Sequence, residues 1–321
     1  MFEIKRFIPI KINNKKILKF HLKIVAESED CLKTRSYLFI LPGGPGANHA
    51  HYTDYEKLAE SVNLVFYDPR GCGLSDEDAP ENYTMDNYID DLEKIRQALG
   101  FSEILLLGKS YGAMCAIQYV LRYSTAVKKL ILAAGSATHK FLTTAEEIVN
   151  KIGNDEQKEA FTTLRKGAFR SVKEVNSYFQ IMHSLYSVKA RTDLYKNPEK
   201  KIYYPFNYQA LNQGFKTFLR SFNFEPDLKS INCPTLILAG ADDWITAPIH
   251  AQNIAHQIPG AKLCIFSQAG HSLEADVPDL YFNKISQFIN SQCKLDKNLA
   301  PLESIQEECE EEELIGRLRK L

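Results

Sequence analysis

The sequence lacks the features of a membrane or nucleic-acid-binding protein. It has no run of 18 consecutive apolar residues, and its start, Met1-Phe-Glu-Ile-Lys, is not a charged segment followed by an apolar one. We therefore expect neither a membrane span nor a secretory signal, which makes the cytoplasm the predicted compartment. Because 39 Lys and Arg nearly cancel 40 Asp and Glu, the charge balance predicts no nucleic-acid partner.

The seven cysteines form no recognisable pattern. They are odd in number and scattered, without metal-ligand spacing: Cys31, Cys72, Cys115, Cys233, Cys264, Cys293 and Cys309. Such usage predicts reduced thiols rather than a disulfide framework or a metal site. Neither a metal ion nor another cofactor is expected.

Short apolar runs and helical patterns alternate along most of the chain. Two stretches with alternating apolar residues, Phe2 to Ile10 and Lys16 to Val25, flank the turn-prone Asn13-Asn14 and predict an antiparallel hairpin. Almost wholly apolar runs, typical of strands buried on both faces, follow at 37–41, 64–67, 104–107, 129–133, 235–239 and 262–266. Helical patterns at 88–99, 111–123, 248–258 and 280–289 separate several of them, so an α/β fold with a mostly parallel, doubly wound sheet is predicted.

The alternation breaks in two places. Residues 136–230 are helical in pattern, polar and rich in aromatics, which predicts a helical cap inserted into a core formed by residues 1–135 and 231–293. Residues 294–321 form an acidic tail that includes the run from Glu303 to Glu313.

The strongest chemical motif is a G-x-S-x-G. Gly108-Lys-Ser110-Tyr-Gly112 follows the apolar run that begins at Ile104 and precedes a helical pattern, which is the strand-to-helix context of a nucleophile elbow. The two glycines permit a sharp turn that exposes the serine hydroxyl, so Ser110 is the predicted nucleophile. The backbone N–H of Tyr111 would then face the reacting oxygen.

A serine nucleophile requires a base and an acid that orients the base. His271 follows the run 262–266, and Asp243 follows the run 235–239, so both are expected at the same sheet edge as Ser110. The chain order Ser, Asp, His suits this arrangement. Asp243 is preferred because of its strand-Gly-x-x-Asp spacing, and Asp242 is its rival.

The second oxyanion donor is expected after the run 37–41. There Pro42-Gly43-Gly44-Pro45-Gly46 supplies backbone N–H groups that a substrate can approach closely. Gly44 is the preferred donor and Gly43 the alternative.

This combination of motifs resembles the proline iminopeptidase (prolyl aminopeptidase) family of α/β-hydrolases. Residues 42–46 resemble that family's H-G-G-P-G, residues 68–75 its D-x-R-G-x-G-x-S, and residues 108–112 its nucleophile elbow. The resemblance implies an α/β-hydrolase fold, a helical cap over the site and release of N-terminal residues from peptides. It also implies that Asp68 and Arg70 support the loop beside the oxyanion hole.

The chain departs from the family pattern where the substrate is expected. Pro42, Lys109 and Tyr111 replace the family's histidine, glycine and tryptophan. Residues 206–215 resemble the cap segment E-N-H-Y-F-x-N-x-G-F, but Phe206 stands where the glutamate that helps hold the substrate's ammonium would be. Phe206, Tyr208 and Gly43 are the expected pocket residues.

These observations predict a serine hydrolase that cleaves an amide or ester through an acyl-enzyme. A short peptide or amino-acid amide is the expected substrate, and a small apolar ester is the alternative because the cap is rich in aromatics. A non-catalytic scaffold should have lost a triad residue or an oxyanion glycine, and neither loss is seen. The acidic tail resembles the glutamate-rich signals of some bacterial type IV secretion substrates, so a secretion or interaction signal is an alternative to a solvated helix.

Overall fold

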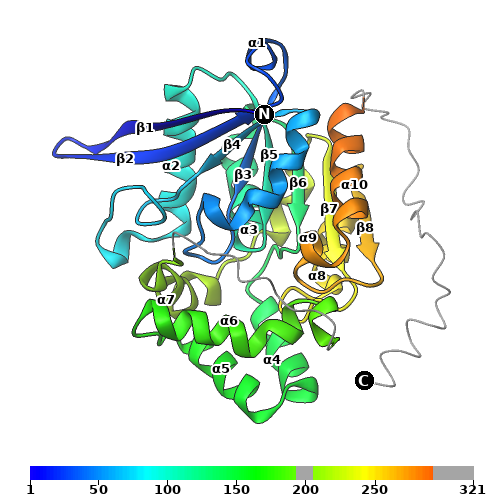
Figure 1. The fold of residues 1–321 in the computed structure, drawn as a ribbon. Helices are drawn as coiled ribbons and strands as arrows, with labels where there is room; N and C mark the ends of the chain where they lie inside the picture. Colours follow the sequence, from blue (N-terminus) through cyan, green and yellow to red (C-terminus); the bar gives the residue numbers. More distant parts are fainter. Residues whose placement is uncertain (193–204, 292–321) are drawn as a thin grey trace.

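The computed structural model describes residues 1–192 and 205–291, and an eight-stranded sheet lies at its centre (Figure 1). The strand order is β1-β2-β4-β3-β5-β6-β7-β8. β1 (Phe2–Asn13) pairs antiparallel with β2 (Lys16–Ala26), and β2 pairs antiparallel with β4 (Asn63–Tyr67). The other pairings, between neighbours in this order, are parallel. They involve β4, β3 (Tyr37–Leu41), β5 (Ile104–Lys109), β6 (Val127–Ala133), β7 (Thr235–Gly240) and β8 (Lys262–Phe266). The predicted fold class is confirmed.

The sheet is covered on both faces, which explains why its central strands are apolar throughout. One core cluster joins the sheet to α2 (Met85–Ala98), α3 (Tyr111–Arg122) and α8 (Pro248–Gln257). The other joins it to η1 (His49–Glu60) and α10 (Pro278–Asn290). Strands enclosed in this way have no solvated face that would favour alternating polar residues.

Short elements connect these layers. They are α1 (Cys31–Thr34), η2 (Pro80–Asn82), η3 (Ser124–Ala126) and α9 (Leu273–Asp276). Parallel strands end at a common edge, where α/β proteins place their ligands. The predicted residues Gly44, Ser110, Asp243 and His271 follow β3, β5, β7 and β8 and so lie at this edge, whereas Phe206 and Tyr208 come from the segment between β6 and β7.

The segment between β6 and β7 is mainly helical, as the sequence predicts. It contains α4 (Phe141–Ile152), α5 (Asp155–Lys166), α6 (Val172–Tyr186), η4 (Lys189–Arg191), α7 (Tyr208–Lys216), η5 (Phe218–Arg220) and η6 (Glu225–Ser230). Figure 1 shows α4 to α7 gathered beyond one end of the sheet. The division into core 1–135 and 231–293 and cap 136–230 remains a prediction.

The acidic tail predicted at 294–321 lies outside the described residues, as do Cys293 and Cys309. Cys31, Cys72 and Cys115 are free thiols. Across residues 1–192 and 205–291, no helix combines the length and apolar character needed to cross a bilayer.

Candidate active site

Ser110 occupies the sharp turn that joins β5 to α3. Its φ is 57°, in the left-handed region that side-chain-bearing residues rarely adopt, and its N–H donates to Ala133 O at 2.8 Å. A Cβ at Gly108 would lie 2.2 Å from Gly112 O, and one at Gly112 would lie 2.1 Å from Leu41 O. Only glycine fits at both positions, so the packing around the turn accounts for the spacing of the motif.

His271 and Asp243 form a buried hydrogen-bonded pair. His271 Nδ1 lies 2.7 Å from Asp243 Oδ2. Asp243 Oδ1 accepts the N–H groups of Ile245 and Thr246, both at 2.9 Å, and its Oδ2 accepts Thr246 Oγ1 at 2.8 Å. Asp242, the rival of Asp243 in sequence, is partly exposed and lies 3.2 Å from Arg191.

The surroundings of Asp243 favour its ionised form. Burial raises the pKa of Asp243, but the charge and hydrogen bond of His271 and the two contacts of Thr246 outweigh burial and hold that pKa below its ordinary value. A carboxylate at Nδ1 fixes the orientation of the imidazole and leaves Nε2 available to act as a base. The pair can therefore perform the role predicted for it.

The loops of Ser110 and His271 adjoin each other through Lys109. Its Nζ donates to His271 O at 2.6 Å. In the part of the chain that the structure describes, residues 1–192 and 205–291, Ser110 and His271 share no hydrogen bond. Catalytic hydrogen bonds often tighten only when substrate binds.

The loop after β3 borders the nucleophile. A Cβ on Gly43 would lie 3.1 Å from Ser110 Cβ. Gly43 N–H already donates to the hydroxyl of buried Tyr52 at 2.6 Å, which leaves Gly44 as the candidate second oxyanion donor. Tyr111 is the first residue of α3, so its N–H has no acceptor within the helix.

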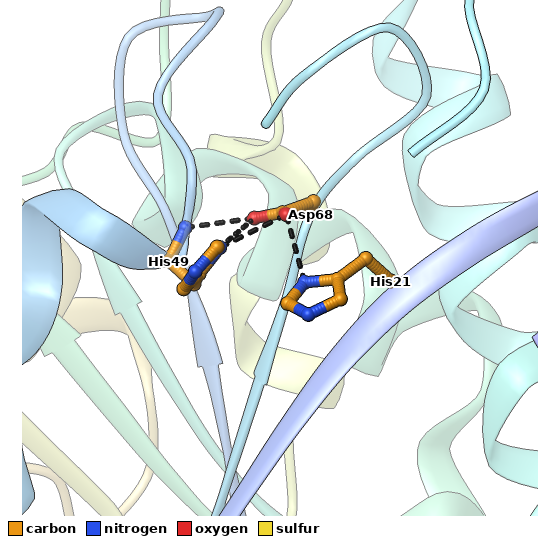
Figure 2. Close-up of side chains that lie close together, drawn as sticks. All are labelled: His21, His49 and Asp68. Carbon is orange, nitrogen blue, oxygen red and sulfur yellow. Dashed lines mark hydrogen bonds and ion pairs between the residues drawn. The ribbon is translucent and has the colours of Figure 1, made fainter. Parts of the chain in front are cut away.

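Asp68 holds the loop that follows the oxyanion segment, as the family resemblance implies. Figure 2 shows its carboxylate between two imidazoles: His21 Nδ1 at 3.0 Å and His49 Nδ1 at 2.8 and 2.9 Å. It also accepts the backbone N–H groups of His49 at 2.8 Å and Leu74 at 3.0 Å. Burial raises the pKa of Asp68, but the hydrogen bonds from His21 and His49 and the charge of His49 outweigh burial and lower it to about 2.

His21, His49 and Asp68 are also the described residues that could hold a metal ion. One ligand atom from each lies within 4.8 Å of the others. However, both Nδ1 atoms are at hydrogen-bond distance from a carboxylate that already accepts two backbone N–H groups. The cluster is satisfied as a hydrogen-bonded support for the loop.

Arg70 is the second support implied by the family resemblance. Its guanidinium binds both carboxylate oxygens of Asp91, on α2, at 2.7 Å each. It also donates to Asp78 at 3.0 Å. These contacts fasten the segment after β4 to the body of the fold.

An aromatic side chain lies where the family resemblance places an ammonium-binding glutamate. A Cβ on Gly44 would lie 3.2 Å from the ring of Phe206, which also contacts the rings of His51 and Phe179 at centroid distances of 4.6 and 4.9 Å. Tyr186 lies 5.5 Å from the ring of His271. Rings therefore border both the oxyanion loop and the base.

The neighbouring cap residues fasten the chain. Asn207 N–H donates to Gly46 O at 2.9 Å, and its side chain donates to Gly71 O at 2.7 Å. Tyr208 begins α7 and packs half-buried against the main core. Its role in the substrate pocket remains a prediction.

Tyr52 and Thr246 contact site residues that the sequence did predict, although neither was itself expected there. Thr246 follows Asp243 by three residues, a spacing at which an Asp side chain often accepts local N–H groups, so a signal was present. Tyr52 had none, because its hydroxyl reaches Gly43 only through the packing of η1 against the sheet.

The chain is similar to known proteins along most of its length. The model of the alpha/beta hydrolase fold family matches residues 37–274. A proline iminopeptidase of Saccharolobus solfataricus is 30% identical over 268 residues, which cover 79% of this chain and 84% of that protein.

Two solved structures share the fold. A Mycobacterium smegmatis proline iminopeptidase has a TM-score of 0.65 and 18% identity, with 88% of this chain and 97% of that one covered. An Exiguobacterium antarcticum esterase has a TM-score of 0.66 and 18% identity, with 90% of this chain and 100% of that one covered. Since a peptidase and an esterase match equally well, the fold does not select a substrate. The family match and the sequence relatives together place this chain in the α/β-hydrolase family, among its proline iminopeptidase-like members.

Proposed function

We propose that this chain is a serine hydrolase that cleaves an amide or ester bond through an acyl-enzyme on Ser110. His271 removes the proton from Ser110 Oγ as the serine attacks the carbonyl carbon, and later donates it to the leaving group. Asp243 orients the imidazole and stabilises its protonated form. Gly44 and Tyr111 N–H groups bind the oxyanion of the tetrahedral intermediate.

The observation that carries this proposal is the buried His271–Asp243 hydrogen bond of 2.7 Å at the sheet edge where Ser110 is held at positive φ. A carboxylate with a lowered pKa beside an imidazole is an arrangement suited to general-base catalysis. Ser110 is the candidate nucleophile because its turn exposes a hydroxyl at the start of a helix.

The leading substrate class is a short peptide or amino-acid amide with a free amine, in keeping with the proline iminopeptidase relatives. Phe206 favours a second candidate, a small apolar ester. An aromatic ring offers an ammonium only a cation–π contact, whereas a carboxylate offers a charge-assisted hydrogen bond. With Phe206 beside Gly44 and Tyr186 beside His271, the described rim suits an apolar acyl group.

One pair of substrates separates the two classes. The ratio of kcat/KM for an aminoacyl-arylamide and its N-acetylated form measures the contribution of the free amine to the transition state. A carboxylate anchor should give a ratio of about tenfold to a hundredfold, because charge-assisted hydrogen bonds contribute roughly 1.5–3 kcal/mol. The peptidase proposal expects that ratio, and a ratio near one together with rapid cleavage of short acyl esters would favour the esterase.

A fluorophosphonate tests the chemistry independently of the substrate. Ser110 Oγ forms a bond to phosphorus, fluoride leaves, and His271 takes up the serine proton. We expect the unmutated protein to be labelled at Ser110, and Ser110→Ala to remain unlabelled. Labelling that persists in Ser110→Ala would reject this serine as the nucleophile.

A further inference from the structure

A buried lysine connects the nucleophile turn to the base. Lys109 ends β5 immediately before Ser110, and only 4% of it is exposed. Its Nζ lies 2.6 Å from His271 O and 2.8 Å from Glu274 Oε2. A single side chain thus links the residue preceding Ser110 to the backbone of His271.

Burial of the Lys109 ammonium costs free energy, because it removes a charged group from water. Lysine is rarely buried without a partner, and an ion pair of this kind often adds little stability over an apolar pair of similar volume. Glu274, on α9, balances the charge, and its side chain is 25% exposed. The contact that an apolar pair could not supply is the hydrogen bond to His271 O.

Hydrogen bonds from several elements hold the His271 segment, and Lys109 supplies one of them. Asp243 Oδ2 binds the imidazole at 2.7 Å, and Asp276 Oδ2 accepts Gly270 N–H at 2.8 Å. Lys109 binds the carbonyl of His271, and the N–H of the same peptide group, that of Ser272, donates to Tyr186 O at 2.9 Å. Since these groups come from different elements, the base is located relative to the sheet edge rather than by its own loop.

We propose that Lys109 is a positioning residue that holds His271 at the working distance from Ser110, with Glu274 neutralising its charge. This inference rests on the proposed roles of Ser110 and His271. Lys109 does not touch the reacting atoms and acts through the His271 carbonyl. A base displaced by about 1 Å can lose up to a hundredfold in rate, so a contact of this kind has kinetic consequences.

The rate of fluorophosphonate labelling at Ser110 tests the proposal without a known substrate. Lys109→Met keeps much of the side-chain volume and removes the ammonium. We expect labelling to slow by about tenfold to a hundredfold. The matched control is Lys129→Met, because buried Lys129 likewise donates to backbone carbonyls, those of Phe288, Ile289 and Ser291, on another part of the sheet. That variant should lose stability but be labelled at the unmutated rate.

A double variant separates positioning from stability. Lys109→Met with Glu274→Leu removes both charges, so the thermal midpoint should recover relative to Lys109→Met alone. Labelling should remain slow, because His271 O still lacks its donor. If the double variant recovers the labelling rate together with its stability, Lys109 has only a structural role. If Lys109→Met alone does not fold, the double variant still decides the question.

Two failures can be distinguished. An unmutated protein that is not labelled at Ser110 contradicts the proposed function itself. An unmutated protein that is labelled at Ser110, together with Lys109→Met labelled at the same rate, contradicts the positioning role alone.

Discussion

Two adjacent carboxylates, Asp242 and Asp243, occupy opposite environments one residue apart. Asp243 is 2% exposed and accepts four hydrogen bonds, including that of His271. Asp242 is partly exposed, and its partner is the side chain of Arg191 on η4. Asp243 is therefore the carboxylate in contact with the imidazole, whereas Asp242 takes part in a partly exposed ion pair that water screens.

We expect Asp243→Asn to lower kcat by about a thousandfold or more, since an amide at this position no longer stabilises the protonated base and can select the wrong tautomer. Asp242→Asn is the matched control and should retain most of the activity. Turnover of an activated ester, or the labelling rate at Ser110, measures both. The reverse order of sensitivity would transfer the role to Asp242.

The residues that sequence could identify are those defined by their place after a strand. Ser110, Asp243 and His271 each follow an apolar run, and parallel strands bring such positions to one edge. Tyr52 and Lys109 could not be assigned their contacts in this way. Their polar atoms reach Gly43 and His271 by tertiary packing, for which neither spacing nor local pattern gives a signal.

At the level of elements, α9 joins the end of α6 to the base loop through Asp276. Its carboxylate accepts Ser187 Oγ at 2.5 Å and the N–H groups of Val188 and Lys189 at 3.0 and 3.1 Å. It also accepts Gly270 N–H at 2.8 Å. One buried residue therefore fastens the segment after α6 to the loop that carries His271.

Asp276→Asn should reduce the free energy of unfolding by about 1–3 kcal/mol, because an amide cannot accept at every one of these donors and leaves at least one buried N–H unsatisfied. Urea unfolding measures the change. Asp279→Asn removes the same charge from an exposed position on α10 and serves as the control. Equal stability of the two variants would show that the Asp276 contacts contribute little.

Across the whole molecule, pattern and topology explain the sheet better than they explain the helical segment between β6 and β7. The runs 37–41 and 262–266 coincide with β3 and β8, and the hairpin of β1 and β2 forms as expected. The apolar runs and the alternating pattern of the hairpin both reflect environments that stay regular along a strand, buried or half-buried. In the helical segment, an aromatic residue in the sequence suits either core packing or a pocket. The structure is needed to place the ring of Phe206 beside Gly44.

Acid stability is a property of the whole chain to which Asp68 makes a predictable contribution. Its pKa is lowered from 3.8 to about 2 in the folded protein. A lowered folded pKa stabilises the protein at pH values above the unfolded pKa, and this contribution is lost as the pH falls through the folded pKa. A shift of this size corresponds to roughly 2 kcal/mol at neutral pH, of which about half is lost by pH 3.

The difference in free energy of unfolding between the unmutated chain and Asp68→Asn should therefore narrow by about 1 kcal/mol between pH 6 and pH 3, because asparagine does not titrate. Urea unfolding at a series of pH values measures the difference. Asp227→Asn, at an exposed carboxylate, should show no comparable narrowing. A gap for Asp68→Asn that stays constant with pH would mean that His21 and His49 do not stabilise the ionised carboxylate, and that Asp68 supports its loop through the N–H groups of His49 and Leu74 alone.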